Sequence, residues 1–131
     1  MIYRILDANL NRLREGIRVI EDIARYFLDS HPLSRRLKDL RHKARINSDL
    51  LHYRDIKNDV SKQSNTSEAK RENLKDIAIA NFKRAQESAR VVEEVLKLDS
   101  KRGDYLAFKH IRYELYDIEI AFFDALDSTK G

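Results

Sequence analysis

Three polar side chains at helical spacing occur twice in this chain. An amide, a guanidinium and a carboxylate stand three residues apart, and the same trio returns 72 residues later. The two trios are Asn9, Arg12 and Glu15, and Asn81, Arg84 and Glu87. The asparagines and arginines project from an otherwise largely apolar arc of a helix, where polar groups cost free energy unless they are partnered. Because a guanidinium grips oxyanions at two points, a small phosphorylated ligand is one such partner.

The plainer alternative is that the arginine and the glutamate of each trio form an ion pair along a solvated helix. Such pairs, three residues apart, contribute only about 0.2 to 0.5 kcal/mol each. The duplication keeps two further arginine–glutamate pairs, which we expect to face solvent: Arg18 with Glu21, and Arg90 with Glu93. On sequence grounds both interpretations of the trios stay open.

The trios belong to a duplicated pair of helices. Residues 8–25 return as residues 80–97, and residues 37–44 match residues 108–115. Apolar side chains recur at the three- and four-residue spacing of helices, and strand signals are absent. Four helices are predicted, at about residues 5–28, 33–55, 72–98 and 104–127. We therefore predict an all-α fold, a four-helix bundle made of two duplicated α-hairpins with pseudo-two-fold symmetry.

The length of 131 residues suits a single helical domain with one core. We place the repeat halves at about residues 3–56 and 73–127, with a polar linker at about residues 57–72. Arg12 and Arg84 then approach the symmetry axis from opposite sides, each near an arginine of the following helix. Those two arginines are Arg41 and Arg112, and the expectation is one shared cationic pocket.

The amino-acid composition argues against several classes of protein function. The 26 basic and 22 acidic residues are interleaved, without the basic and aromatic blocks typical of nucleic-acid binding, and the net charge of +4 favours anionic partners. No apolar run could cross a membrane and there are no cysteines, so we expect a cytoplasmic protein. A Walker-type phosphate loop and an HExxH zinc motif are both missing. We also favour a homodimer, because amphipathic bundles often associate.

Several ordered segments together resemble one known family. The segments are ILDANLNRLREGIRVIEDIARY, LKDLRHK, YRDIKNDV, NFKRAQESARVVEEVLKL and FKHIRYELYDIE. They resemble the helical domain found ahead of the thiamine phosphate synthase barrel in some bacteria, a domain that also occurs alone. That domain is regarded as an alternative hydroxymethylpyrimidine phosphate kinase, and the resemblance runs from about residue 3 to residue 122.

The resemblance implies a phosphotransferase of thiamine biosynthesis that binds ATP and Mg²⁺. A phosphoryl group would pass from ATP to 4-amino-5-hydroxymethyl-2-methylpyrimidine phosphate and give the diphosphate. Since such a transfer is mainly positioning and charge neutralisation, we assign roles by chemical type. We expect the phosphate oxygens to bind Arg12, Arg84, Arg41 and Arg112, and the pyrimidine to bind Asn9 or Asn81. The expected ligands of Mg²⁺ are Glu15, Glu87, Asp55 and Asp59. We expect Arg54 to close over the nucleotide. Among these, Arg12, Arg84, Glu15 and Glu87 form the catalytic set.

Other interpretations remain at this stage. Asp55 and Asp59 could shape a turn instead of binding metal, and Arg41 and Arg112 could extend over apolar surface toward water. Relatives tend to carry a Gly-Thr pair where this chain has Ser61-Lys62, which weakens the case for a phosphate-binding loop there. Two other function classes compete with the kinase: a metal-independent helical enzyme that acts on a small dianion, and a non-catalytic module that binds a protein or an anionic ligand.

Overall fold

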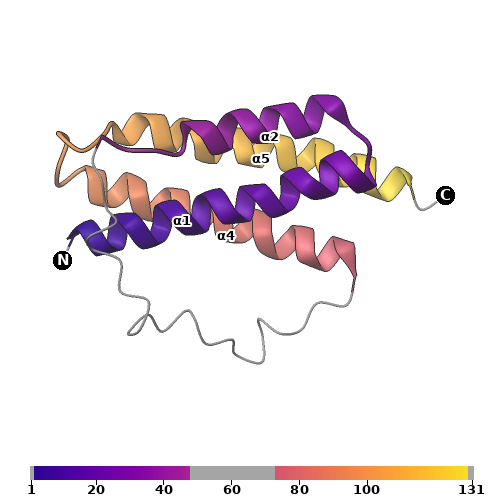
Figure 1. Cartoon of the computed structure of the whole chain (residues 1–131), viewed down its shortest axis with the longest axis horizontal. Coiled ribbons are helices and arrows are strands. Elements are labelled where there is room, and N and C mark those ends of the chain that lie inside the picture. Colours follow the sequence, from indigo (N-terminus) through magenta and orange to yellow (C-terminus); the bar gives the residue numbers. More distant parts are fainter. Residues whose placement is uncertain (1, 48–72, 130–131) are drawn as a thin grey trace.

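The computed structural model describes residues 2–47 and 73–129, and it shows a bundle of four helices (Figure 1). The elements in chain order are α1 (Ile2–Asp22), the short π-helix η1 (Ile23–Phe27), α2 (His31–Lys43), α4 (Leu74–Leu96) and α5 (Tyr105–Ser128). Within the described ranges there is no strand. The predicted all-α four-helix bundle is therefore confirmed, and no described helix is long and apolar enough to cross a membrane.

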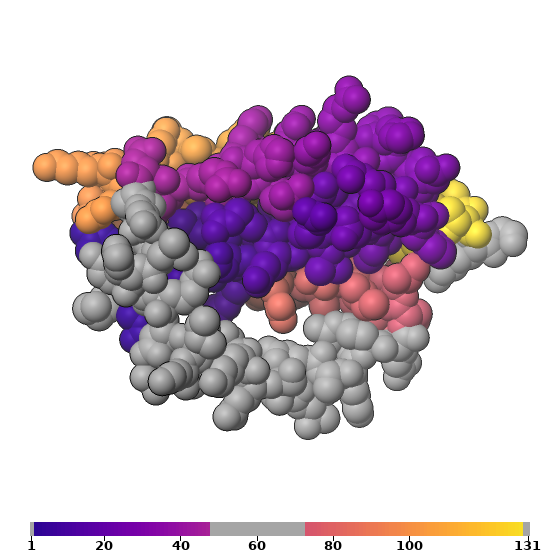
Figure 2. Space-filling view, in the orientation of Figure 1, coloured from indigo at the N-terminus to yellow at the C-terminus, as the bar shows by residue number. Residues whose placement is uncertain are grey.

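Each helix packs against two neighbours. α1 contacts α2 and α4, and α5 contacts the same two helices from the other side. α1 and α4 run in opposite directions and share the largest interface, whereas α2 lies alongside α5 (Figure 1). In the space-filling view α1 and α2 form one continuous surface (Figure 2). The largest fully buried side chains are Phe82, Phe108, Phe122, Leu6, Leu13, Ile17, Ile20, Leu37, Leu96, Ile111, Leu115 and Ile118.

A glycine sets the close approach of α1 to α4. A Cβ atom added to Gly16 would lie 3.1 Å from the backbone oxygen of Asn81 and 3.4 Å from the Cβ of Ala85. The oxygen belongs to a helix backbone and cannot move away easily. Gly16 therefore fixes which turns of α1 and α4 face each other.

Local signals explain most of the helix ends. The side chains of Ser30, Asn73 and Asp104 accept hydrogen bonds from backbone N–H groups in the first turns of α2, α4 and α5. Pro32 stands in the first turn of α2, where a missing N–H costs nothing. The N- and C-terminal ends of α4 and α5 agree with the predicted helices to within about two residues.

The second helix is shorter than predicted. We expected it to reach residue 55, but α2 ends at Lys43. Arg14 of α1 donates a hydrogen bond of 2.7 Å to the backbone oxygen of Ala44, so this side chain takes over an acceptor at the end of the helix. A long-range contact of this kind leaves no periodic signal in the sequence. The predicted linker, residues 57–72, lies outside the described residues.

Candidate functional site

The two arginines of the trios lie near the contact between α1 and α4. Arg12 is half-buried and Arg84 is exposed. Gly16 faces Asn81 and Ala85 across the contact, and Arg12 precedes Gly16 by one helical turn. Because α1 and α4 run in opposite directions (Figure 1), both arginines fall at about the same level of the bundle.

Neither arginine is neutralised by a carboxylate. In the part of the chain that the structure describes, Arg12 and Arg84 form no ion pair or side-chain hydrogen bond. Glu15 and Glu87, three residues further along each helix, are exposed and do not pair with them. The alternative that each trio contains an ion pair along its own helix is therefore wrong for this structure. Both guanidinium groups can accept an anion from outside.

The two asparagines hold matching positions on their helices. The Nδ2 atom of Asn9 donates to the backbone oxygen of Ile5 at 2.9 Å, and that of Asn81 donates to Ile77 at 2.8 Å. Each amide is thus fixed by a carbonyl one turn earlier, and its Oδ1 atom has no hydrogen-bond donor among residues 2–47 and 73–129. What each asparagine can offer a ligand is chiefly an acceptor oxygen.

One ion pair with a buried carboxylate joins the two helices of each hairpin. Arg41 of α2 donates to both carboxylate oxygens of Glu21 on α1, at 2.7 and 3.3 Å. Arg112 of α5 donates in the same way to Glu93 on α4, at 2.5 and 3.0 Å. The prediction that Glu21 and Glu93 face solvent is therefore wrong, since they are only 1% and 2% exposed. Burial is tolerated because the following helix supplies a guanidinium to each carboxylate.

Among the described residues, the four arginines of the expected shared pocket divide into two sets, because Arg41 and Arg112 are held by Glu21 and Glu93. Glu21, which holds Arg41, stands nine residues beyond Arg12, which is about 13 Å along the axis and half a revolution around it. The duplication repeats this separation for Arg84 and Arg112. Arg41 and Arg112 are thus placed as clamps between helices, apart from the two unpaired arginines.

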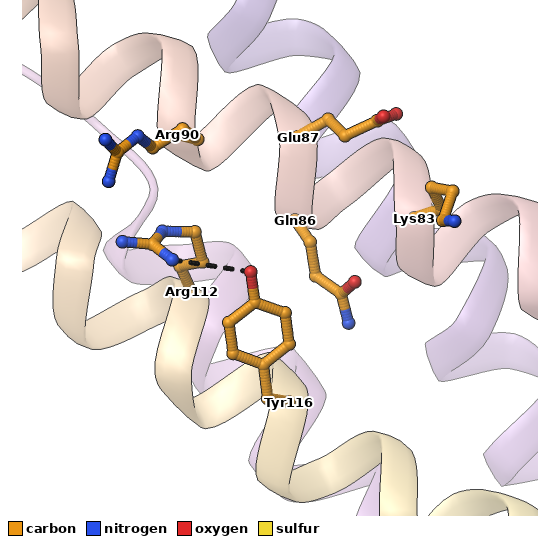
Figure 3. A pocket seen from close by; sticks show the side chains of 6 residues that line it. All are labelled: Lys83, Gln86, Glu87, Arg90, Arg112 and Tyr116. Atoms are coloured by element: carbon orange, nitrogen blue, oxygen red, sulfur yellow. Dashed lines mark hydrogen bonds between the residues drawn. The ribbon is translucent and has the colours of Figure 1, made fainter.

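A pocket of about 460 Å³ opens between α4 and α5 (Figure 3). Its lining residues are Lys83, Gln86, Glu87, Arg90, Arg112 and Tyr116. Gln86 and Tyr116 point into the space between the two helices, whereas the carboxylate of Glu87 points away from Arg112 (Figure 3). The volume falls within the range of small-molecule sites, and three of the six side chains are cationic.

Hydrogen bonds organise this pocket for an oxyanion. Arg112 donates to the hydroxyl oxygen of Tyr116 at 3.3 Å, which leaves the Tyr116 proton available to a ligand. The bonds to Glu93 and then to Tyr116 raise the pKa of Arg112 above its ordinary value, so this guanidinium keeps its charge. Arg90 pairs with Glu94 at 2.9 Å. Lys83 has no ion-pair partner within the described ranges and offers a free ammonium group.

Two of these residues, Glu87 and Arg112, are predicted site residues from the sequence, and the other four are not. Lys83 and Arg90 flank Glu87 on the exposed side of α4, which was a usable signal, but the contribution of Tyr116 depends on the packing of α5. The corresponding position of the first hairpin differs in its side chains. There Arg14 stands in the place of Gln86, and it bonds Asn11 at 2.8 Å as well as Ala44.

The remaining predicted site residues cannot be placed. Arg54, Asp55 and Asp59 lie outside the described residues, as does the Ser61-Lys62 pair. Among the residues that are described, no group of three or more His, Cys, Asp or Glu side chains is arranged to hold a metal ion.

Comparison with known proteins adds the family. The model of the ThiD2 family matches residues 4–121. The chain is 40% identical over 123 residues to a thiamine-phosphate synthase of Nostoc sp., a match that covers 91% of this chain and 34% of that protein. It is also 40% identical over 122 residues to one from Synechocystis sp., with 90% and 35% covered. The chain thus spans about a third of the length of these relatives, and no solved structure matches it. Since the family match takes in most of the chain, this protein belongs to the ThiD2 family.

Proposed function

We propose that this protein acts in thiamine biosynthesis, as a kinase that phosphorylates 4-amino-5-hydroxymethyl-2-methylpyrimidine phosphate with ATP. The observation that carries the proposal is the family match over residues 4–121, together with relatives that are thiamine-phosphate synthases. Their name places these relatives in the synthesis of thiamine phosphate, the pathway to which the proposed kinase would belong.

The proposed phosphoryl transfer depends more on cationic groups than on a general base. An oxygen of the pyrimidine monophosphate attacks the γ-phosphorus of ATP, the bond to the β-phosphate oxygen breaks, and ADP leaves. A phosphate monoester has its second pKa near 6, so the attacking oxygen is already ionised at neutral pH. Positioning and charge neutralisation then supply most of the catalysis. Unpaired guanidinium and ammonium groups on a rigid bundle meet this need.

We assign the pyrimidine monophosphate to Arg12 and Arg84. Within the described residues neither guanidinium has a carboxylate partner, both groups lie near the contact between α1 and α4, and a guanidinium suits phosphate geometry. Asn81 lies one turn before Arg84, so its acceptor oxygen can take a hydrogen bond from the amino group of the pyrimidine.

We assign the phosphates of ATP to the pocket between α4 and α5. Lys83 supplies an ammonium group with no ion pair among the described residues, Arg90 and Arg112 line the pocket while paired with Glu94 and Glu93, and the Tyr116 hydroxyl adds a donor. On the surface of α4, Glu87 lies between Arg84 and Lys83, about 60° from the first and 40° from the second. It therefore stands between the two proposed phosphate sites.

Glu87 is also the described residue that best fits Mg²⁺. Its carboxylate is exposed and has no ion pair in the described part of the chain. Mg²⁺ in kinases is commonly held by one or two carboxylates together with substrate phosphates, so one protein ligand beside a triphosphate site is consistent with such an ion. Bound there, the ion would neutralise phosphate oxygens. Glu15 is the matching carboxylate on α1.

The proposal is tested by following the products. Purified protein is incubated with the pyrimidine monophosphate, ATP and Mg²⁺, and phosphorus NMR records the diphosphate and ADP. We expect the two products in equal amounts, and no ADP when the pyrimidine is omitted. Unchanged substrates at micromolar protein concentration would count against a kinase. Hydrolysis of ATP without formation of the diphosphate would count against it equally.

A further inference from the structure

The outer face of α5 exposes large apolar side chains at a regular interval. Leu106, Tyr113 and Ile120 are 53%, 55% and 67% exposed, and each follows the previous one by seven residues. Tyr116, 38% exposed, lies three residues after Tyr113 and four before Ile120, on the side of these residues that borders the pocket with α4. The inner face of α5 already supplies the bundle core. The helix is therefore apolar on two sides.

This spacing is typical of a helix that packs against a partner helix along one side. Apolar residues at alternating steps of three and four keep one side of a helix facing a partner helix over several turns. Scattered exposed apolar residues need no explanation, but a continuous stripe of them marks an interaction surface. No described helix of this chain covers the stripe, since α2 and α4 pack against the other sides of α5.

The charge along α5 identifies the partner. The first half of its outer side carries Lys109 and the second half carries Asp124, whereas Asp117 already pairs with Arg36 of α2 at 2.8 Å. A helix that is basic at one end and acidic at the other is complementary to a copy of itself running in the opposite direction. Two-fold symmetric pairing of identical patches is also the commonest way in which soluble proteins associate.

We propose that two copies of this protein pair through the outer faces of α5, with the two helices antiparallel. Ile120 and Tyr113 occupy the centre of the contact, and Lys109 of one copy reaches Asp124 of the partner. Within one copy the two charges are fifteen residues apart, about 22 Å along the helix, too far to meet. Neither forms an ion pair within the described residues, although the ammonium of Lys109 lies 5.9 Å from the centre of the Tyr113 ring.

The first test is the mass in solution. Sedimentation velocity of the full chain at 5 to 50 μM should give twice the mass of 15.5 kDa. Ile120→Asp places a charge at the centre of the contact and should give the mass of one chain. Leu106→Asp provides a second variant. The matched control is Leu98→Asp, because Leu98 is 81% exposed but lies outside α5. A single-chain mass for the unmodified protein would overturn the proposal, and so would an Ile120→Asp variant that still pairs.

The second test fixes the direction of pairing. Lys109→Asp and Asp124→Lys each create two repulsive contacts in a symmetric pair, so each should raise the dissociation constant about tenfold. The double variant exchanges the charges and should return it to within about threefold of the original. Circular dichroism checks that the helix content is unchanged in every variant. A double variant weaker than both single variants would exclude the antiparallel arrangement. None of the substituted residues lines the pocket between α4 and α5, so the variants change the pairing surface without removing a proposed phosphate ligand.

Discussion

Arg112 on α5 donates two hydrogen bonds to the carboxylate of Glu93 on α4, at 2.5 and 3.0 Å. The same contact recurs between Arg41 and Glu21 in the first hairpin. A duplicated sequence has therefore kept a duplicated clamp, which joins the two helices of each hairpin at a buried carboxylate. Arg41 serves in this clamp, whereas Arg112 serves in the clamp and also lines the pocket between α4 and α5.

The clamp should stabilise the fold strongly. Replacing Glu93 by Gln leaves the Arg112 guanidinium without its counter-charge in a mostly buried place, and we expect the free energy of unfolding to fall by about 3 kcal/mol. Urea unfolding followed by circular dichroism measures this change. The control is Glu94→Gln, because Glu94 is an exposed partner of Arg90 and Lys97 and should cost less than about 1 kcal/mol. Equal losses of unfolding free energy from the two substitutions would show that the clamp stabilises the fold no more than an exposed ion pair does.

The contribution of Arg112 to the free energy of unfolding should not depend on pH near neutrality. Its pKa is raised in the folded state, first by Glu93 and then by Tyr116. A raised pKa stabilises the fold fully below the unfolded pKa and loses that effect only as the pH rises through the folded pKa. An unfolded arginine titrates only above about pH 12. The difference in unfolding free energy between the unmodified protein and Arg112→Met should therefore stay constant from pH 7 to pH 10, whereas a steady decline over this range would contradict the assignment.

The contact at Gly16 should reject larger side chains. Gly16→Val places a branched side chain against the backbone oxygen of Asn81, where a Cβ already lies at 3.1 Å. We expect a loss of about 2 kcal/mol from overpacking. Gly16→Ala should cost less, because alanine regains up to about 1 kcal/mol of helix propensity. Thermal unfolding compares both with Glu15→Val, an exposed neighbour that should be almost neutral, and a neutral Gly16→Val would mean that α1 and α4 pack less closely.

The helices and the duplication could be predicted from the sequence because they rest on local periodicity and on identity between the halves. Trio residues on the α1–α4 side, such as Arg12 and Asn81, could be predicted for the same reason. The burial of Glu21 could not, since a carboxylate at the margin of an apolar stripe becomes buried only when another helix brings an arginine to it. The end of α2 at Lys43 and the pocket at Tyr116 likewise depend on contacts between segments distant in the sequence.

The two phosphate sites should respond separately to substitution. Lys83→Ala removes the free ammonium of the pocket between α4 and α5, and we expect KM for ATP to rise about tenfold with little change in KM for the pyrimidine monophosphate. Lys75→Ala is the control, because Lys75 is on the same helix but pairs with Asp127 outside the pocket. Steady-state kinetics with each substrate varied in turn measures both values. Equal effects on the two substrates would argue against the assignment of ATP to this pocket.

Calorimetric titration of the pyrimidine monophosphate tests most directly whether Arg12 and Arg84 bind phosphate. We expect measurable binding to the unmodified protein and a loss of at least about a hundredfold in affinity for both Arg12→Ala and Arg84→Ala, since each removes a charged, two-point contact. Arg18→Ala, which removes an exposed arginine paired with Asp22, should bind as the unmodified protein does, and all three variants should keep their helix content. Unchanged affinity in Arg12→Ala and Arg84→Ala would contradict the account.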